Sequence, residues 1–476
     1  MADHDEAAAP AGATADSEEA HSRGYRAWLL IVLMLVNMLN LADRQGLAAI
    51  TPAIKVDLKL TDTQLGLIQG LGFAIFYTLL GLPLARLAER YSRARIVAAS
   101  VAIFSTFLML CSQARSFGQI LLFRVGVGAG DAGFGPPVSS LIGDHYPARQ
   151  RASAMTVIWL GAPIGAMAGA MLGGWVAEHA NWRWWFISLS IPSLAIAALA
   201  FFTLREPRRG QFDAMTQAGP PPSMKEAFTF LLRKRSMVHV LIGAGLAATA
   251  MNGIGQFWGR YFVSVFGISM AEAGQLIGII SVVAMASGLA LGGFGVERLA
   301  KRGRRWFVWG PAIGLVLTTP LFLIGISRAD LWVAMGLLLA GHIALFVYYT
   351  PTLALAQNMV GASMRASSAF VLSLVLGLVG IGLGPTVVGI LSDVLAHHAF
   401  ALGDFNALCP GGAALAGGSA ALASACAAAS ATGIAQAIGA ASLLFAWGGV
   451  HYALASRHLE RDLDTHYQVP PPPPGN

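Results

Sequence analysis

Charged residues are distributed so unevenly along this chain that long stretches contain none. Ten windows of 19 residues or more have no Asp, Glu, Lys or Arg. A helix needs about 20 apolar residues to cross roughly 30 Å of hydrocarbon, so each window is long enough to span a bilayer. The windows are 63–85, 96–114, 152–177, 184–204, 236–259, 273–296, 306–327, 331–364, 366–392 and 405–456.

Two further segments are equally apolar but are interrupted by charge. Asp43 and Arg44 lie within 27–54, and Arg124 and Asp131 lie within 116–143. With these two segments the sequence predicts twelve transmembrane helices. The fold class is therefore an all-α polytopic membrane protein.

Composition excludes a soluble protein. Only 12% of the residues are charged and 56% are hydrophobic, whereas an average soluble domain has about a quarter charged residues. The sequence has no metal-ligand cluster, phosphate-binding loop or nucleophile elbow. We therefore expect no enzymatic activity, no cofactor, no bound metal and no direct drive by ATP.

The basic residues orient the chain in the membrane. The connections after the even-numbered predicted helices contain 19 Lys and Arg, and those after the odd-numbered helices contain 5. Because short cytoplasmic loops carry the excess of basic residues, both termini are expected in the cytoplasm, with the protein in the inner (plasma) membrane. This topology explains the net charge of +7, and we expect no nucleic-acid partner.

The chain divides into two similar halves. Residues 1–24 form an acidic tail expected to be disordered, 25–205 a first bundle, 206–235 a cytoplasmic linker, 236–456 a second bundle, and 457–476 a cytoplasmic tail. The linker contains a run of three prolines, 220–222, and then an amphipathic stretch, 224–235, typical of a helix at the membrane interface. Residues 397–428 are expected to form an extracytoplasmic loop of the second bundle, where Cys409 and Cys426 could form a disulfide or stay free.

The halves also repeat short motifs. Residues 81–95 (GLPLARLAERYSRAR) and 292–305 (GGFGVERLAKRGRR) each place glycines before an acid, an arginine and a basic turn. A second matched pair is the glycine-rich segments 161–174 and 377–393. Two parallel six-helix bundles with a substrate path between them are the organisation of the major facilitator superfamily.

The first half resembles one branch of that superfamily, the Spinster-type lipid transporters. Residues 81–95 resemble the superfamily signature G-x-L-a-D-R-x-G-R-R, with Glu89 in the acid position and Ser92 in place of the glycine. The closer match is carried by 37–44 (NMLNLADR), 124–137 (RVGVGAGDAGFGPP) and 144–151 (DHYPARQR). The branch commonly has Glu where this chain has Asp131. The second half resembles only the superfamily.

The charges inside helices are functional candidates, because a charge at the bilayer centre costs about 2.5–3.5 kcal/mol on insertion scales. Asp43 lies roughly 24 Å along its helix from the inner end, and Arg124 and Asp131 lie about 10 and 21 Å from the outer end of theirs. We expect Asp43 and Asp131 to couple transport to protons, with Asp43 pairing with Arg124 or Arg44 in one state. The alternative is a static network that joins the two helices.

Other polar residues in the helices are predicted to bind substrate. Arg44 suits an anionic headgroup because guanidinium binds phosphate or carboxylate bidentately. Arg124 is predicted to bind substrate as well. Asn252, Gln256 and Arg260 share one helix face, although the amides could instead hold helices together and the arginine could anchor at the interface. His342 lies near mid-membrane and could relay protons or simply pack.

A third set of charges is predicted to form a cytoplasmic gate. Charge pairs at these helix ends could close the inner side while the outer side is open, as the family resemblance implies. The predicted gate residues are Glu89, Arg90, Arg93, Arg149, Arg151, Glu297 and Arg298.

The resemblance implies a secondary transporter. The expected partners are protons, the bilayer and an amphiphilic, anionic, lipid-like substrate of the lysophospholipid or sphingoid-phosphate class, moved by alternating access in a monomer. The alternatives are a carrier for small organic anions or drugs, and a receptor or scaffold that no longer transports.

Overall fold

The structure is a computed structural model that describes residues 23–207, 224–360, 365–415 and 417–464, all of whose regular elements are helices. The first half contains α2 (Arg23–Asp57), α3 (Asp62–Gln69), α4 (Leu71–Arg90), α5 (Arg93–Cys111), α6 (Phe117–Asp131), α7 (Gly135–His145), α8 (Ala148–Trp159), α9 (Gly161–His179) and α10 (Trp182–Thr203). The linker helix α11 (Met224–Arg233) lies within the predicted amphipathic stretch.

The second half repeats this arrangement. It contains α12 (Arg235–Phe266), α13 (Met270–Ala290), η1 (Leu291–Gly295), α14 (Val296–Ala300), α15 (Trp306–Ile326), α16 (Leu331–Phe346), α17 (Tyr349–Asn358), α18 (Arg365–Leu374), η3 (Val375–Leu383), α19 (Gly384–Ala399), α20 (Phe405–Leu408), η4 (Pro410–Gly412), α21 (Ala420–Ala455) and α22 (Leu459–Asp464). The predicted all-helical membrane fold is confirmed.

Eleven of the predicted spans are long and apolar enough to cross a bilayer within the described ranges. The twelfth, predicted over 116–143, is broken between α6 and α7. Asp131 is the last residue of α6, and Pro136 lies in the first turn of α7. Proline fits the first turn because no intrahelical N–H is needed there. The break therefore leaves Asp131 at a helix end inside the first half.

Glycines let α9 approach α2 at backbone distance. A Cβ atom on Gly165 would lie 2.0 Å from the carbonyl oxygen of Met38, and one on Gly169 would lie 2.3 Å from that of Ala42. Small residues are the usual means by which helices pack closely in lipid. The predicted packing role of the glycines near residue 165 agrees with these contacts.

Gly165→Ala is therefore expected to destabilise the protein by about 1–3 kcal/mol, because the methyl group would force α9 away from α2. Gly336→Ala is the matched control, since a Cβ atom on this α16 glycine would meet no atom within 4 Å. Thermal unfolding in detergent should show a loss only for the first variant. An equal effect of both variants would contradict the packing role.

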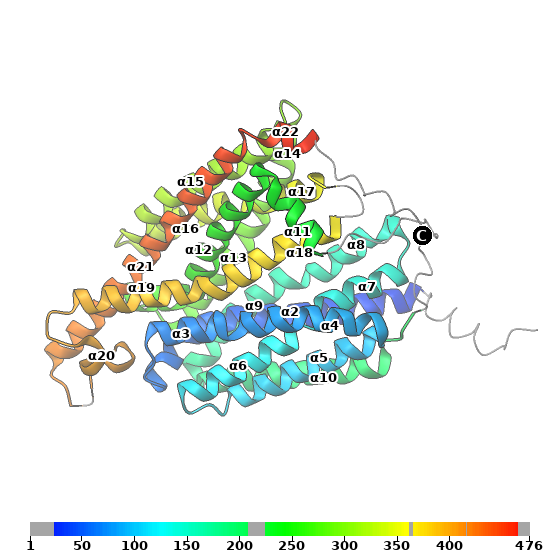
Figure 1. Cartoon of the computed structure of the whole chain (residues 1–476). Coiled ribbons are helices and arrows are strands. Elements are labelled where there is room, and N and C mark those ends of the chain that lie inside the picture. Colours follow the sequence, from blue (N-terminus) through cyan, green and yellow to red (C-terminus); the bar gives the residue numbers. More distant parts are fainter. Residues whose placement is uncertain (1–22, 208–223, 361–364, 416, 465–476) are drawn as a thin grey trace, which may run out of the picture.

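The two halves meet at one end and diverge toward the other (Figure 1). They meet where α3 packs against α19 and where α2 packs against α12. A Cβ atom on Gly66 of α3 would lie 2.3 Å from the carbonyl oxygen of Pro385, and one on Gly389 would lie 2.2 Å from that of Asp62. We call this end, where backbones of the two halves touch, the α3–α19 end.

At the divergent end, part of the predicted 457–476 tail is folded onto the second half. The Ser236 hydroxyl donates a hydrogen bond of 2.7 Å to Asp462 in α22, and the Lys234 ammonium donates one of 2.5 Å to the carbonyl oxygen of the same residue. Burial lowers the pKa of Lys234. Residues 1–22, 208–223 and 465–476, which include most of the predicted tails and linker, lie outside the described residues.

Candidate functional site

Four charged side chains from α2 and α6 form two ion pairs inside the first half, and we call them the charge quartet. The Arg124 guanidinium donates from Nη1 to both carboxylate oxygens of Asp43, at 2.9 and 2.8 Å. The Arg44 guanidinium donates to Oδ2 of Asp131 at 2.5 Å. Each helix thus supplies one acid and one arginine, and each acid pairs with the arginine of the other helix.

The two pairs differ in exposure. The side chains of Asp43 and Arg124 are 1% and 2% exposed, whereas those of Arg44 and Asp131 are 22% and 8% exposed. A buried charge pair is costly to break because the remaining charge has no compensation. The Asp43–Arg124 pair is therefore the sealed one, and the Arg44–Asp131 pair is the one that another molecule can reach.

Two uncharged residues, Asn40 and Phe73, contact the charge quartet. The Asn40 amide donates a 2.6 Å hydrogen bond to Oδ1 of Asp131. The guanidinium carbons of Arg44 and Arg124 lie 4.3 and 5.9 Å from the ring centroid of Phe73, so one aromatic ring contacts both cations. Neither Asn40 nor Phe73 is among the predicted site residues. The spacing of Asn40, three residues before Asp43 on the same helix face, could have indicated it from the sequence. No sequence pattern indicates Phe73.

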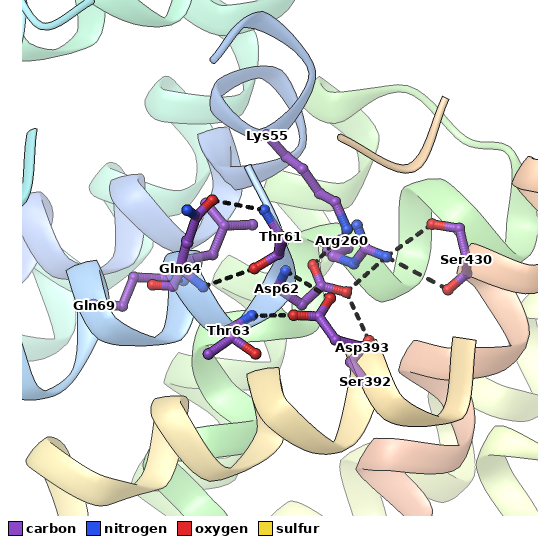
Figure 2. Close-up of polar contacts among 11 residues, drawn as sticks. Lys55, Thr61, Asp62, Thr63, Gln64, Gln69, Arg260, Ser392, Asp393 and Ser430 are labelled. Atoms are coloured by element: carbon purple, nitrogen blue, oxygen red, sulfur yellow. Dashed lines mark hydrogen bonds and ion pairs between the residues drawn. The ribbon is translucent and has the colours of Figure 1, made fainter. Parts of the chain in front are cut away.

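A second group of charges joins the two halves at the α3–α19 end, and Figure 2 shows it. Lys55 donates to Oδ1 of Asp62 at 2.7 Å, and Arg260 of the second half lies 2.9 Å from Oδ2 of the same carboxylate. The Lys55, Asp62 and Arg260 side chains are 3%, 1% and 4% exposed. We call these residues, with Ser392, Asp393 and Ser430, the inter-half cluster.

The rest of the inter-half cluster is also hydrogen-bonded (Figure 2). The Asp393 carboxylate of α19 accepts hydrogen bonds from the backbone N–H groups of Asp62 and Thr63, at 2.9 and 2.7 Å, at the start of α3. An acid at a helix N-terminus is stabilised by the free N–H groups and the helix dipole. Ser392 donates to Asp62 at 2.7 Å, and Arg260 donates to the Ser430 hydroxyl at 2.8 Å. The α3–α19 end is therefore closed by buried, partnered polar contacts.

Comparison with known proteins agrees with this architecture. The family model described as "Major Facilitator Superfamily" matches residues 33–385. This chain belongs to the major facilitator superfamily.

Two relatives and a solved structure place it more closely within the superfamily. The chain is 31% identical over 402 residues to an MFS-type efflux pump of Mycolicibacterium smegmatis, covering 82% of this chain and 91% of that protein. It is 26% identical over 396 residues to protein spinster of Drosophila melanogaster, covering 79% and 64%. A crystal structure of a bacterial homologue of the human lysosomal transporter Spinster, inward-facing and unoccupied, superposes with a TM-score of 0.85 at 29% identity, covering 93% and 99%. The predicted resemblance to the Spinster branch is confirmed.

The three predicted substrate residues on α12 have different surroundings. The Asn252 amide donates to the carbonyl oxygen of Ala248 on its own helix, at 2.9 Å, and Gln256 is half-buried on the same helix. Arg260 lies in the inter-half cluster, where Asp62 of the other half binds its guanidinium. Its side chain is buried, which does not fit an anchor at the membrane interface, and its substrate role stays a prediction. That partner is 198 positions away in sequence, so helix-face spacing alone does not indicate it.

His342 lies in an aromatic pocket of the second half. Its Nε2 accepts a 3.3 Å hydrogen bond from the Trp258 indole, and its Nδ1 lies 2.8 Å from the carbonyl oxygen of Leu338. Its ring lies 4.7 Å from that of Phe322. Both ring nitrogens are thus occupied by structural partners, an arrangement that favours packing over proton relay.

We accordingly expect His342→Gln to leave the pH dependence of transport unchanged while lowering thermal stability. The side chain would lose its ring contacts with Trp258 and Phe322 but keep a polar group near the indole N–H. Uptake into liposomes at several pH values, together with a melting curve, checks this. A flattened pH profile with unchanged stability would restore the relay role.

The predicted cytoplasmic gate residues lie at the divergent end. Arg93 is buried and donates to Asp144 and to Glu206, and the latter distance is 2.5 Å. Both partners belong to the first half or the residues just after it, so these two contacts lie within that half. Arg151 donates to the carbonyl oxygen of Tyr146 at 3.1 Å.

The remaining gate residues either are exposed or have side chains outside the described part of the structure. Arg90, Glu297 and Arg298 are exposed, and the side chains of Glu89 and Arg149 are not among those described. The ion pair between Arg260 and Asp62 joins the two halves at the α3–α19 end. The cytoplasmic gate stays a prediction, because the two halves are apart at that end of the structure (Figure 1).

The disulfide left open by the sequence is formed. Cys409, which lies between α20 and η4, is bonded to Cys426 of α21 across a separation of 17 residues. Cys111 is buried and free.

Proposed function

We propose that this superfamily transporter is a proton-coupled secondary carrier for an amphiphilic anion of the lysophospholipid or sphingoid-phosphate class. The observation that carries the proposal is the unequal exposure of the two quartet pairs. Arg44, the accessible cation, is occupied by Asp131. An anionic headgroup that binds Arg44 must therefore displace this carboxylate.

Protonation supplies the displacement. When Asp131 takes up a proton its charge is lost, the ion pair weakens, and the Arg44 guanidinium is free for a phosphate or carboxylate. When substrate leaves, Arg44 again favours the ionised acid and the proton departs. Substrate and proton are then carried together, because each makes the binding of the other more favourable.

Alternating access requires that the two ends open in turn. We assign the α3–α19 end to the outside, since the disulfide at this end suits an oxidising compartment and the basic loops lie at the other end. The inter-half cluster then acts as the outer gate, and the structure corresponds to an inward-facing state. The similarity to a structure described as inward-facing supports this assignment.

The lipid-like substrate is favoured by the Spinster similarity and by the surroundings of Arg44. The Phe73 and Tyr77 rings lie 4.3 and 5.8 Å from its guanidinium, so a headgroup there would have apolar surface beside it for a chain. A small organic anion is the second candidate, because the chain is also 27% identical to a hexuronate transporter of Bacillus subtilis. Both candidates use Arg44 as the anion site.

Uptake into liposomes separates these candidates. Protein-containing vesicles are given a radiolabelled anionic lysophospholipid, and lipid left in the outer leaflet is removed with albumin. We expect protein-dependent, albumin-protected lysolipid that unlabelled lysolipid competes and glucuronate does not. Transport of glucuronate instead would establish the second candidate, and no flux of either would favour a receptor or scaffold. Arg44→Gln should abolish the signal, and Arg44→Lys should retain part of it.

A further inference from the structure

The segment between α19 and α21 is held tightly to the second half. It contains α20 and η4, and the Cys409–Cys426 disulfide fixes its middle to the first turns of α21. Phe400 and Phe405 are buried side chains of this segment, with their rings 5.6 Å apart. We call residues 400–415 the disulfide loop.

The tip of the disulfide loop crosses to the first half. Gly411 follows Cys409 by two residues and has φ +70°, a conformation that favours glycine. A Cβ atom at this position would lie 2.8 Å from the carbonyl oxygen of Lys55 and 3.3 Å from the Cα atom of Lys59. The tip therefore rests directly on the backbone at the end of α2.

The same tip covers the inter-half cluster. A Cβ atom on Gly412, which has φ +83°, would lie 2.9 Å from the Ser430 hydroxyl and 3.6 Å from the Lys55 ammonium. Ser430 is four residues, or about one turn, after Cys426 on α21. The disulfide thus fixes the loop one helical turn from a group that binds Arg260.

We propose that the disulfide loop is a latch that holds the α3–α19 end closed. The loop belongs to the second half and its tip docks on the first, so the two halves cannot separate at this end while the tip stays in place. The disulfide and the small aromatic core fix the tip in its docked position, which lowers the entropy lost on docking. The latch therefore shifts the conformational equilibrium toward the inward-facing state.

This inference rests on the alternating access proposed above, but its test needs no substrate. Spin labels are placed at Arg115→Cys, after α5, and at His398→Cys, on α19, two exposed positions on opposite halves. Cys111 is buried and does not label readily. Electron paramagnetic resonance distance measurements on the full chain in nanodiscs then give the ratio of separated to closed molecules. Wild-type protein should be mostly closed.

Two variants open the latch by different routes. Gly411→Ala leaves the disulfide intact but places a methyl group against the α2 backbone, and Cys409→Ser/Cys426→Ser removes the covalent link. Each should raise the separated-to-closed ratio about tenfold. Gly417→Ala is the matched control, because Gly417 has φ +86° in the same connection but its Cβ atom would meet nothing within 4 Å. It should leave the ratio unchanged.

Asp62→Asn distinguishes failure of the latch from failure of the gate, since it weakens the inter-half cluster without touching the loop. If Asp62→Asn raises the separated fraction while Gly411→Ala matches Gly417→Ala, the latch is refuted and the gate stands. If none of the variants changes the ratio, the proposal that the α3–α19 end opens during transport is refuted together with the latch.

Discussion

Replacing Arg124 by leucine is expected to lower the unfolding free energy by about 3–5 kcal/mol, the usual cost of removing one partner of a buried ion pair. Asp43 would be left without its compensating cation in a site where its side chain is 1% exposed, and both of its carboxyl oxygens would lose their donor. Titration with sodium dodecyl sulfate in mixed micelles measures this change.

Two further variants make the expected loss specific. Arg44→Leu should cost less, since Arg44 is 22% exposed and water can solvate Asp131. Asp43→Asn/Arg124→Leu removes both charges and should recover at least half of the stability lost by the single arginine variant. A single Arg124→Leu variant as stable as wild type would show that the sealed pair is not structural.

Replacing Asp131 by asparagine is expected to remove the pH dependence of substrate binding and to reduce proton-driven uptake at least about tenfold. Asparagine resembles the protonated acid in shape and charge, so Arg44 would be free at every pH. In wild-type protein, binding of the anion should strengthen as pH falls, because protonation of Asp131 releases Arg44. Ligand-induced thermal shifts from pH 5 to 8 measure this.

Asp131→Glu is the matched variant for the coupling role. It keeps an ionisable carboxyl one methylene further from the backbone, the residue that the Spinster branch commonly has there. It should retain a pH-dependent shift. If Asp131→Asn and wild type show the same pH profile, proton coupling through this residue is excluded.

The fold could be predicted because its main determinant is local. Charge-free windows of membrane-spanning length define the helices without knowledge of any long-range contact, and the loop charges predict an orientation in the membrane. The break between α6 and α7 carried a local signal as well, since the adjacent Gly135 and Pro136 begin a new helix. The uneven distribution of charged residues was therefore enough to predict an all-helical membrane fold.

Pairing within the candidate site was only partly predictable. Depth along the helices indicated that Asp43 and Arg124 could meet, and the structure joins them. Depth gave no partner for Asp62, whose ion pair with Arg260 spans 198 positions between different halves. Lys55 and Asp62 lie at helix ends, where a charge is ordinarily a solvated loop residue. Their burial follows from the docking of the two halves, which local sequence does not encode.

The measurement that tests proton-coupled transport most directly is the proton movement caused by substrate itself. Liposomes containing wild-type protein and an internal pH dye receive the anionic lysolipid outside, with no initial pH gradient. We predict acidification of the lumen that accompanies albumin-protected uptake, a markedly smaller signal for Asp131→Asn, and faster uptake when the outside is made acidic. Uptake of the same lipid with no change in lumenal pH, and at a rate that an imposed proton gradient does not alter, would contradict the account.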